Sequence, residues 1–243
     1  MLQPKSSSLF HFTKNIDFLC GILKNGFYPR YSFEDLHWLD SGLGTVGWPI
    51  VCFCDIPLGR ISDQVAFYGG YGIGLTRTWG ISRALNPLLY VSPKSSFAGD
   101  FHDIYHDLME SRSKKSQLHY GAMLSLAVFL KPLTGTVIVD GKAVPKAFYQ
   151  ESEWRHSARD RMIEPFISPR ESAKKKRIAN EQAAKMCPLK FTPGDVRHIF
   201  VKTDSEIPTL VNFINNELDR FPSNELKVLS TRITSLESLD PDL

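Results

Sequence analysis

The chain is organised around Phe148-Tyr149-Gln150-Glu151-Ser152-Glu153-Trp154-Arg155, where two glutamates lie two residues apart between aromatic side chains. Side chains alternate along a β-strand, so a strand here would place Glu151 and Glu153 on one face and Ser152 on the other. Like charges held close together push one pKa up, which is one way for a carboxylate to acquire a catalytic role. Taken alone, the stretch favours a plainer interpretation, a solvated polar strand edge with Trp154 reaching back into the core.

The composition is that of an ordinary globular protein. Of 243 residues, 42% are hydrophobic and 23% are charged, and this length suits one large domain or two small ones. A chain of this size needs no disulfide or metal to stabilise its core. The formal net charge of +3 is too small to indicate nucleic-acid binding by itself.

The cysteines and the apolar runs indicate a cytoplasmic protein without a membrane segment. Cys20 lies in a helical pattern and Cys52 and Cys54 in an apolar run, which with Cys187 is typical of thiols in a reducing compartment. The C-x-C spacing has no second pair to complete a zinc site. The longest apolar run, Ala122–Leu130, is far too short to span a membrane.

Periodicity predicts many short strands and helices in a mixed order. The chain opens with a strand at Leu9–Thr13 and a helix that Asn15 caps and Asn25-Gly26 ends. Further strands are predicted at 48–54, 72–77, 88–91, 136–139, 196–201 and 226–229, and further helices at 61–68, 79–84, 97–115, 118–130 and 207–218. The helix at 118–130 is expected to be the best buried. The order is not the strict alternation of a doubly wound sheet, so the expected fold class is α+β.

Residues from about 168 to 187 form a basic and polar segment. Lys174, Lys175, Lys176 and Arg177 follow one another, which fits either a mobile loop or an exposed helix. A solvated face is the default interpretation of such a run. The sharper interpretation is a contact with nucleic acid or with an acidic partner.

A histidine, a threonine and two tyrosines form a second group of candidate site residues. In a strand, His11 and Thr13 share a face and together offer donors and acceptors to a sugar, although a lone histidine is more often a hydrogen-bonded structural group. Tyr68 and Tyr71 suit core or lid positions. The glycines at 69–74 would permit close approach of a ligand.

Other chemistries lack their motifs. The glycines at 69–74 do not fit G-x-G-x-x-G, and the sequence has neither a P-loop nor a G-x-S-x-G serine. His102 and His106 lie four residues apart on a predicted helix, a spacing that suits two metal ligands, but no third ligand is apparent. No metal site is therefore predicted.

Four stretches, taken in order and spacing, resemble the AbiGi family of abortive phage-resistance proteins, which carries an antitoxin label. They are Leu9–Thr13 with its helix and Gly26, Cys52–Pro57, Tyr68–Leu75 with Trp79 and Asn86-Pro87, and Glu151–Arg155. The resemblance runs from Leu9 to about Asn215. It implies a role in phage defence and a cognate toxin or antitoxin protein as partner.

The layout is also similar to ADP-ribosyltransferases of the DarT and PARP-like kind. These carry His-x-Thr on an early strand and then a helix with the pattern I-L-x-x-G, and His11, Thr13 and Ile22-Leu23-x-x-Gly26 stand in that pattern here. The resemblance implies one domain over residues 1–243, with a split mixed β-sheet core, flanking helices and a helical insertion at about 97–131. It also implies NAD as a substrate.

In such transferases the early-strand histidine holds a ribose of NAD and aromatic side chains pack on nicotinamide. Carried over residue by residue, the resemblance assigns cofactor binding to His11 with Thr13, and the nicotinamide contact to Tyr68 or Tyr71. No resident metal is implied.

The same resemblance makes Glu153 the catalytic residue, with Glu151 orienting or deprotonating the acceptor as in the E-x-E pair of arginine-directed transferases. Cleaving the nicotinamide–ribose bond builds an oxocarbenium-like cation, which a well-placed carboxylate stabilises. The alternative is that Glu153 pairs with Arg155 or Arg159 on the surface.

Two functions follow from these patterns. The first is an NAD-dependent ADP-ribosyltransferase or NAD glycohydrolase of phage defence, whose acceptor could be a nucleic acid held by Lys174–Arg177. The alternative is a non-catalytic antitoxin or regulatory component that neutralises a partner toxin by protein binding. No helix-turn-helix pattern is present, which argues against operator binding.

Overall fold

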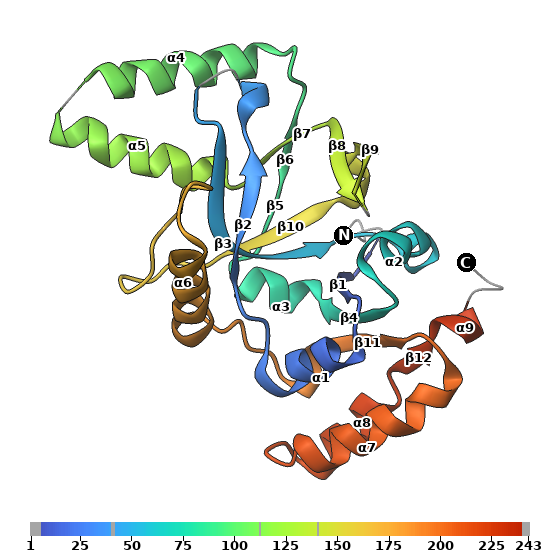
Figure 1. The fold of residues 1–243 in the computed structure, drawn as a ribbon. Helices are drawn as coiled ribbons and strands as arrows, with labels where there is room; N and C mark the ends of the chain where they lie inside the picture. Colours follow the sequence, from blue (N-terminus) through green and yellow to red (C-terminus); the bar gives the residue numbers. More distant parts are fainter. Residues whose placement is uncertain (1–5, 40–41, 112, 140, 240–243) are drawn as a thin grey trace. The chain divides into compact units, whose positions relative to one another are not determined.

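The computed structural model describes residues 6–39, 42–111, 113–139 and 141–239. The chain forms two compact units (Figure 1). Unit 1 comprises the N-terminal segment up to Phe27, Cys52–Leu85 and the chain from Pro188 onward, and unit 2 comprises Tyr28–Val51 and Asn86–Cys187. Both units combine strands and helices, so the predicted α+β class is confirmed.

The strands of unit 1 follow the order β12-β11-β4-β1, and β1 also pairs with the last residues of β3. All neighbours are antiparallel except β11 and β12, which are parallel, so the sheet is mixed. The strands are β1 Ser8–Thr13, β4 Tyr71–Thr76, β11 Val196–Val201 and β12 Ile233–Ser235. Apolar side chains fix the register, because a slip by one residue would turn each of them toward the other face.

Two glycines of β4 allow the central strands to pack. Gly72 lies opposite Phe12 and Gly74 opposite Phe10 in the β1–β4 pair. A Cβ on Gly72 would lie 2.6 Å from Cδ1 of Phe12, and one on Gly74 would lie 2.7 Å from Cε1 of Phe10. Both rings also pack against Phe200 of β11. These glycines therefore make room for phenylalanine rings, whereas the sequence suggested room for a ligand.

The helices of unit 1 follow their local sequence signals. They are α1 Ile16–Asn25, α2 Ser62–Tyr68, α3 Arg77–Ser82, α7 Ile207–Glu217, α8 Ser223–Ser230 and α9 Leu236–Leu239, with short 3-10 turns at Leu58–Arg60, Pro193–Asp195 and Asp204–Glu206. The side chain of Asn15 accepts a hydrogen bond from the backbone of Asp17, and Gly26 ends α1 with φ of 78°. Both predicted boundaries of this helix are confirmed.

The strand predicted at 226–229 is wrong, because these residues lie in α8. Leu226 and Leu229 are buried three residues apart, and Val228 between them is exposed. That spacing is helical, and four residues are too few to distinguish it from strand alternation. The strand of this region, β12, begins only at Ile233.

In its described part, unit 2 contains strands that pair around β3 and two separate two-stranded sheets. Its strands are β2 Arg30–Asp35, β3 Thr45–Cys54, β5 Asn86–Pro87, β6 Leu89–Val91, β7 Leu130–Pro132, β8 Thr134–Val139, β9 Lys142–Ala147 and β10 Glu153–Ser157. β2 is antiparallel to β3, β10 lies between β3 and β5, β6 and β7 are parallel, and β8 and β9 form a hairpin. The last residues of β3, from Cys52, belong to unit 1.

The helices of unit 2 are α4 Ser96–Glu110, α5 Lys114–Ala127 and α6 Ala173–Met186, with 3-10 turns at His37–Leu39 and Phe148–Glu151. α4 and α5 lie side by side as a hairpin (Figure 1), and in the chain this hairpin connects β6 to β7. α5 is not the best-buried helix that the sequence predicted, because Leu118 is 73% and Leu126 68% exposed. The buried residues of α5 are Ser116 near its start and a stripe of Met123, Leu124 and Ala127 near its end. In the four described ranges, no helix is long and apolar enough to cross a bilayer.

Gly74→Ala and Gly21→Ala form a matched pair in unit 1. The first substitution places a methyl group against the ring of Phe10 and should destabilise the fold by about 1–3 kcal/mol. The second adds a methyl group inside α1 where nothing lies within 4 Å, and should stabilise the fold by roughly 0.5–1 kcal/mol. Thermal unfolding followed by circular dichroism measures both. Equal midpoints for the two variants would contradict the packing role of Gly74.

Candidate functional site

The stretch 148–155 is a turn followed by a strand, not one continuous strand. Phe148–Glu151 forms a 3-10 turn, Ser152 has left-handed backbone angles (φ 44°, ψ 50°), and β10 begins at Glu153. The prediction that Glu151 and Glu153 share one strand face is therefore wrong. The turn still brings both carboxylates to one lysine, since Lys131 Nζ lies 3.1 Å from Glu151 Oε2 and 2.6 Å from Glu153 Oε2.

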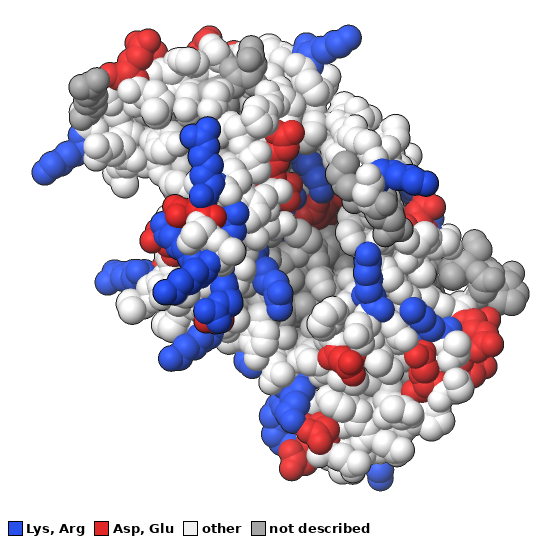
Figure 2. Space-filling view, in the orientation of Figure 1, with Lys and Arg blue, Asp and Glu red and all other residues white. Residues whose placement is uncertain are grey.

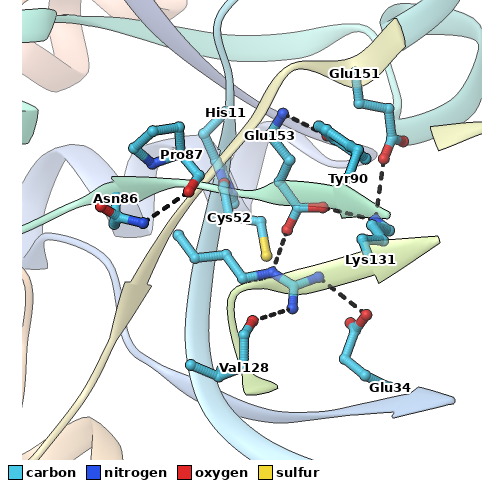
Figure 3. Close-up of polar contacts among 11 residues, drawn as sticks. His11, Glu34, Cys52, Asn86, Pro87, Tyr90, Val128, Lys131, Glu151 and Glu153 are labelled. Carbon is cyan, nitrogen blue, oxygen red and sulfur yellow. Dashed lines mark hydrogen bonds and ion pairs between the residues drawn. The ribbon is translucent and has the colours of Figure 1, made fainter. Parts of the chain in front are cut away.

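These glutamates belong to a larger group in unit 2, the Arg155 cluster, which consists of Glu34, Lys131, Lys146, Glu151, Glu153 and Arg155. Figure 3 shows Glu34, Val128 and Glu153 converging on one guanidinium, and Glu151 and Glu153 converging on Lys131. Lys146 adds an ion pair to Glu151. The cluster thus joins side chains from β2, β7, β9, β10 and the turn before β10.

Arg155 is the centre of the cluster. Its Nε donates to Glu153 Oε1 at 2.6 Å, its Nη2 lies 2.9 Å from Glu34 Oε2, and its Nη1 donates to the carbonyl of Val128 at 2.7 Å. The side chain is only 1% exposed. A guanidinium presents its donors in a fixed fork, so a site that satisfies three of its nitrogens also fixes the direction of each partner.

Burial makes this pairing obligatory. Glu151 and Glu153 are buried along with Arg155, and charges removed from water must be paired or lose their charge. Burial alone would lower the pKa of Lys131, but the carboxylates of Glu153 and Glu151 outweigh it and the pKa rises. Lys131 therefore stays charged, and each carboxylate oxygen of Glu153 faces a cation.

Tyr90 closes the cluster on the side of β6. The backbone N–H of Glu153 donates to the Tyr90 hydroxyl at 2.8 Å. Burial is the main cause that raises the pKa of Tyr90 to about 12, so the phenol stays neutral. The start of β10 is thereby held by the Tyr90 hydroxyl as well as by the ion pairs of Glu153.

The sequence predicted one contact of the Arg155 cluster and gave no sign of the others. Pairing of Glu153 with Arg155 was one of the two interpretations and is confirmed, although the pair is buried and does not lie on the surface. Lys131 lies 20 and 22 residues before its two glutamates, and no local period connects it to them. Glu34 and Lys146 likewise carried no signal that could have placed them.

His11 lies in unit 1 and makes structural contacts. Its Nδ1 lies 2.9 Å from the carbonyl oxygen of Cys52, so this nitrogen carries the proton and donates. The ring packs against Phe27 and Phe53. Burial lowers the pKa of His11, which keeps the imidazole neutral. The interpretation of a hydrogen-bonded structural histidine fits this environment.

The other candidate cofactor residues also lie in unit 1. Thr13 stands opposite Tyr71 in the β1–β4 pair. The Tyr71 hydroxyl donates to Glu206 Oε1 at 2.6 Å, and burial, with that bond, raises the pKa of Tyr71 to about 12. Tyr68 ends α2 and is 42% exposed. Unit 1 thus holds all four proposed NAD contacts, and unit 2 holds both glutamates.

His102 and His106 do lie together on α4, with ring centroids 4.2 Å apart. Across the described part of the chain, no group of three or more histidine, cysteine, aspartate or glutamate side chains could hold a metal ion.

The basic segment forms an exposed helix and not a loop. The side chain of Ser172 caps α6 by accepting from the backbone of Lys175. Ala179 and Ala183 pack against Tyr31 and Ile167. Lys174, Lys175 and Arg177 remain exposed, and Figure 2 shows blue side chains with some red ones over this helix. Two ion pairs between residues four positions apart reduce the positive charge of this segment. They join Glu171 to Lys175 and Glu181 to Arg177.

Glu153→Gln should destabilise the protein by about 3–5 kcal/mol, because Lys131 and Arg155 would both lose a buried carboxylate partner. Glu171→Gln is the matched control, since Glu171 lies just before α6 and pairs with exposed Lys175, and such surface pairs contribute little to stability. Urea unfolding followed by circular dichroism compares the two variants. Similar midpoints would show that the Arg155 cluster does not carry stability.

Stability should fall as the pH drops below about 6.5, because the unfolded state then binds a proton at His11, whereas desolvation in the fold disfavours the protonated imidazole. His11→Asn keeps a donor for the Cys52 carbonyl and should make this decline shallower, by up to about 1.4 kcal/mol per pH unit. Burial also lowers the pKa of His198, but that residue is present in both proteins and cancels.

Urea midpoints between pH 7 and pH 5 provide the measurement for His11. His119→Asn, at an exposed position of α5, is the control and should follow the parent protein. Parallel curves for the parent protein and His11→Asn would show that His11 is not held neutral by the fold.

Comparison with known proteins places this chain in a family. The family model described as "Putative abortive phage resistance protein AbiGi, antitoxin" matches residues 25–202. A relative, the abortive phage resistance protein AbiGi of Lactococcus lactis subsp. cremoris, is 27% identical over 249 residues, which cover 89% of this chain and 99% of the relative. No solved structure matches the chain. The chain belongs to the AbiGi family of abortive phage-resistance proteins.

Proposed function

We propose that this protein is the antitoxin of an abortive-infection system and that it neutralises a partner toxin by binding it directly. The observation that carries the proposal is the match of residues 25–202 to a family described as an antitoxin. An antitoxin of this kind requires a stable scaffold and an exposed recognition surface, and it does not require a reactive side chain.

The Arg155 cluster supports a structural role for the two glutamates. Glu153 directs one oxygen to Arg155 and the other to Lys131. Three carboxylates, of Glu34, Glu151 and Glu153, face three cations, so the cluster has no excess negative charge to offer a developing oxocarbenium ion. Catalysis by Glu153 would require breaking buried ion pairs that the fold itself uses.

The exposed face of α6 is the surface that we propose for the toxin. Lys174 and Arg177 are exposed, and α6 is anchored to the rest of unit 2 by alanines on its opposite side. A basic helix face suits an acidic patch on the partner. Charges at such a rim mainly increase the association rate and fix the orientation of the complex.

In a growth assay, co-expression of this chain should restore growth to cells that express the toxin encoded beside it. Lys174→Gln with Arg177→Gln should reduce the association rate with purified toxin about tenfold at low salt, because two charges of the contact face are lost. Lys114→Gln with Lys115→Gln removes two exposed charges from α5 of the same unit and should leave the rate unchanged. Biolayer interferometry measures both.

Two results would count against this proposal. If the chain neither binds the neighbouring toxin nor restores growth, the antitoxin function is wrong. If it binds and the two double variants associate equally fast, the function stands and the toxin contacts a surface other than α6.

An NAD-dependent ADP-ribosyltransferase or NAD glycohydrolase is the second candidate function. Its support is the sequence pattern, in which His11-x-Thr13 and Glu151-x-Glu153 stand in the order that resembles ADP-ribosyltransferases. Nicotinamide release from NAD by the purified chain distinguishes the two functions. Release that is lost in Glu153→Gln while the circular dichroism spectrum is retained would establish the enzyme, and the antitoxin proposal expects no release.

A further inference from the structure

Unit 2 contains a cavity of about 320 Å³ that neither candidate function uses. It lies against β3, the end of α5 and the loop after β10. Its lining residues are Trp48, Ser125, Ser157, Ala158, Arg159, Asp160, Arg161, Ile163, Pro165 and Phe166. Its volume is at the lower end of the range of about 300–1,000 Å³ that is typical of small-molecule sites.

The loop that forms this cavity is fixed at both ends to β3, on either side of Trp48. The backbone of Ala158 donates to the carbonyl of Pro49 at 2.9 Å. Gly47 and Ile167 exchange two backbone hydrogen bonds, of 2.9 and 2.8 Å. A Cβ on Gly47 would lie 2.8 Å from the ring of Phe33, so glycine permits the close approach of that ring to β3. The walls of the cavity are therefore formed before any ligand arrives.

The loop is also fixed internally. Asp160 Oδ1 accepts a hydrogen bond from the backbone of Met162 at 2.8 Å. The hydroxyl of Tyr31 donates to the carbonyl of Glu164. The carboxylate of Asp160 is thus already engaged by the loop backbone, and it is the one negatively charged side chain among the lining residues.

The lining divides into an apolar part and a part rich in hydrogen-bond donors. Trp48 and Ile163 are almost fully buried in the wall, whereas Phe166 is half-buried and Pro165 exposed, so these two provide the accessible apolar surface. Arg159 and Arg161 are exposed beside the cavity, and Arg159 reaches the carbonyl of Ser125 only at 3.3 Å. Arginine binds phosphate and carboxylate groups through its planar fork of donors.

Trp48 lies almost fully enclosed in the wall of the cavity, with an indole N–H that lacks an acceptor within the described part of the chain. Its side chain is 2% exposed, and among the described residues its Nε1 has no hydrogen-bond partner. A buried donor without an acceptor costs free energy, so native proteins rarely retain one without a reason. The indole N–H of Trp48 is enclosed by protein, so the residue contributes a rigid part of the cavity wall and not a donor for an occupant.

We propose that this cavity binds a small aromatic anion of the nucleoside monophosphate class. Its ring would lie on the apolar surface of Phe166 and Pro165 beside Trp48, and its phosphate would lie between Arg159 and Arg161. The hydroxyls of Ser125 and Ser157 are additional donors in the lining. The site lies within unit 2, and its existence does not depend on the proposed antitoxin function.

Isothermal titration of the full-length chain with 5′-AMP, 5′-UMP, adenosine and inorganic phosphate tests this site. Each nucleotide should bind at least tenfold more tightly than adenosine or phosphate, because only the nucleotides engage the apolar surface and the arginines together. Arg159→Gln with Arg161→Gln should weaken nucleotide binding at least tenfold and leave adenosine binding unchanged. Lys114→Gln with Lys115→Gln removes two exposed charges of the same unit elsewhere and should change neither.

Tryptophan fluorescence provides a second measurement. Binding of 5′-AMP should change the emission of the parent protein, and Trp48→Phe should lose most of that change. If this variant fails to fold, the two arginine substitutions, which lie at exposed positions, still decide the proposal by calorimetry. Failure of both nucleotides to bind, or equal nucleotide affinity in the parent and the double arginine variant, would overturn it.

Discussion

The buried guanidinium of Arg155 is the constraint on which unit 2 depends. It holds the carboxylates of Glu34 and Glu153 and the carbonyl of Val128, and so ties together β2, β10 and the residue that directly follows α5. A charge at this depth must keep its partners, because an unpaired one would be strongly destabilising. The chain is thereby held to one arrangement of these segments, since each nitrogen of the guanidinium fork fixes the direction of its partner.

The same pairing decides what the glutamates can do. A carboxylate that serves in group transfer must be able to face the reacting atoms, whereas Glu153 faces Arg155 and Lys131. Two acidic side chains beside each other are therefore not by themselves a catalytic pair. Their chemistry depends on whether substrate or protein neutralises them, and here protein cations do so.

In unit 1 the neutral side chain of His11, another candidate site residue, is likewise engaged by contacts within the protein. His11 and Thr13 alternate with Phe10 and Phe12 along β1, which put a polar pair on one face of a predicted strand. In the fold, the His11 ring donates to the Cys52 carbonyl and packs between aromatic rings. Recognition of another molecule is better served by surfaces outside these cores, such as the exposed face of α6 and the cavity beside Trp48.

The sequence by itself determined the α+β class, the caps of α1, the strand β1, the existence of the helices α4 and α5, and membership in the AbiGi family. These depend on short-range periods, on turn residues or on the order of motifs, all of which can be read locally. Tertiary structure alone decided that the chain turns at Ser152, that Lys131 and Glu34 complete the Arg155 cluster, and that Leu226–Leu229 is helical. The physical reason is that burial and charge pairing join residues far apart in the chain, and no local pattern records which distant partner will neutralise a buried charge.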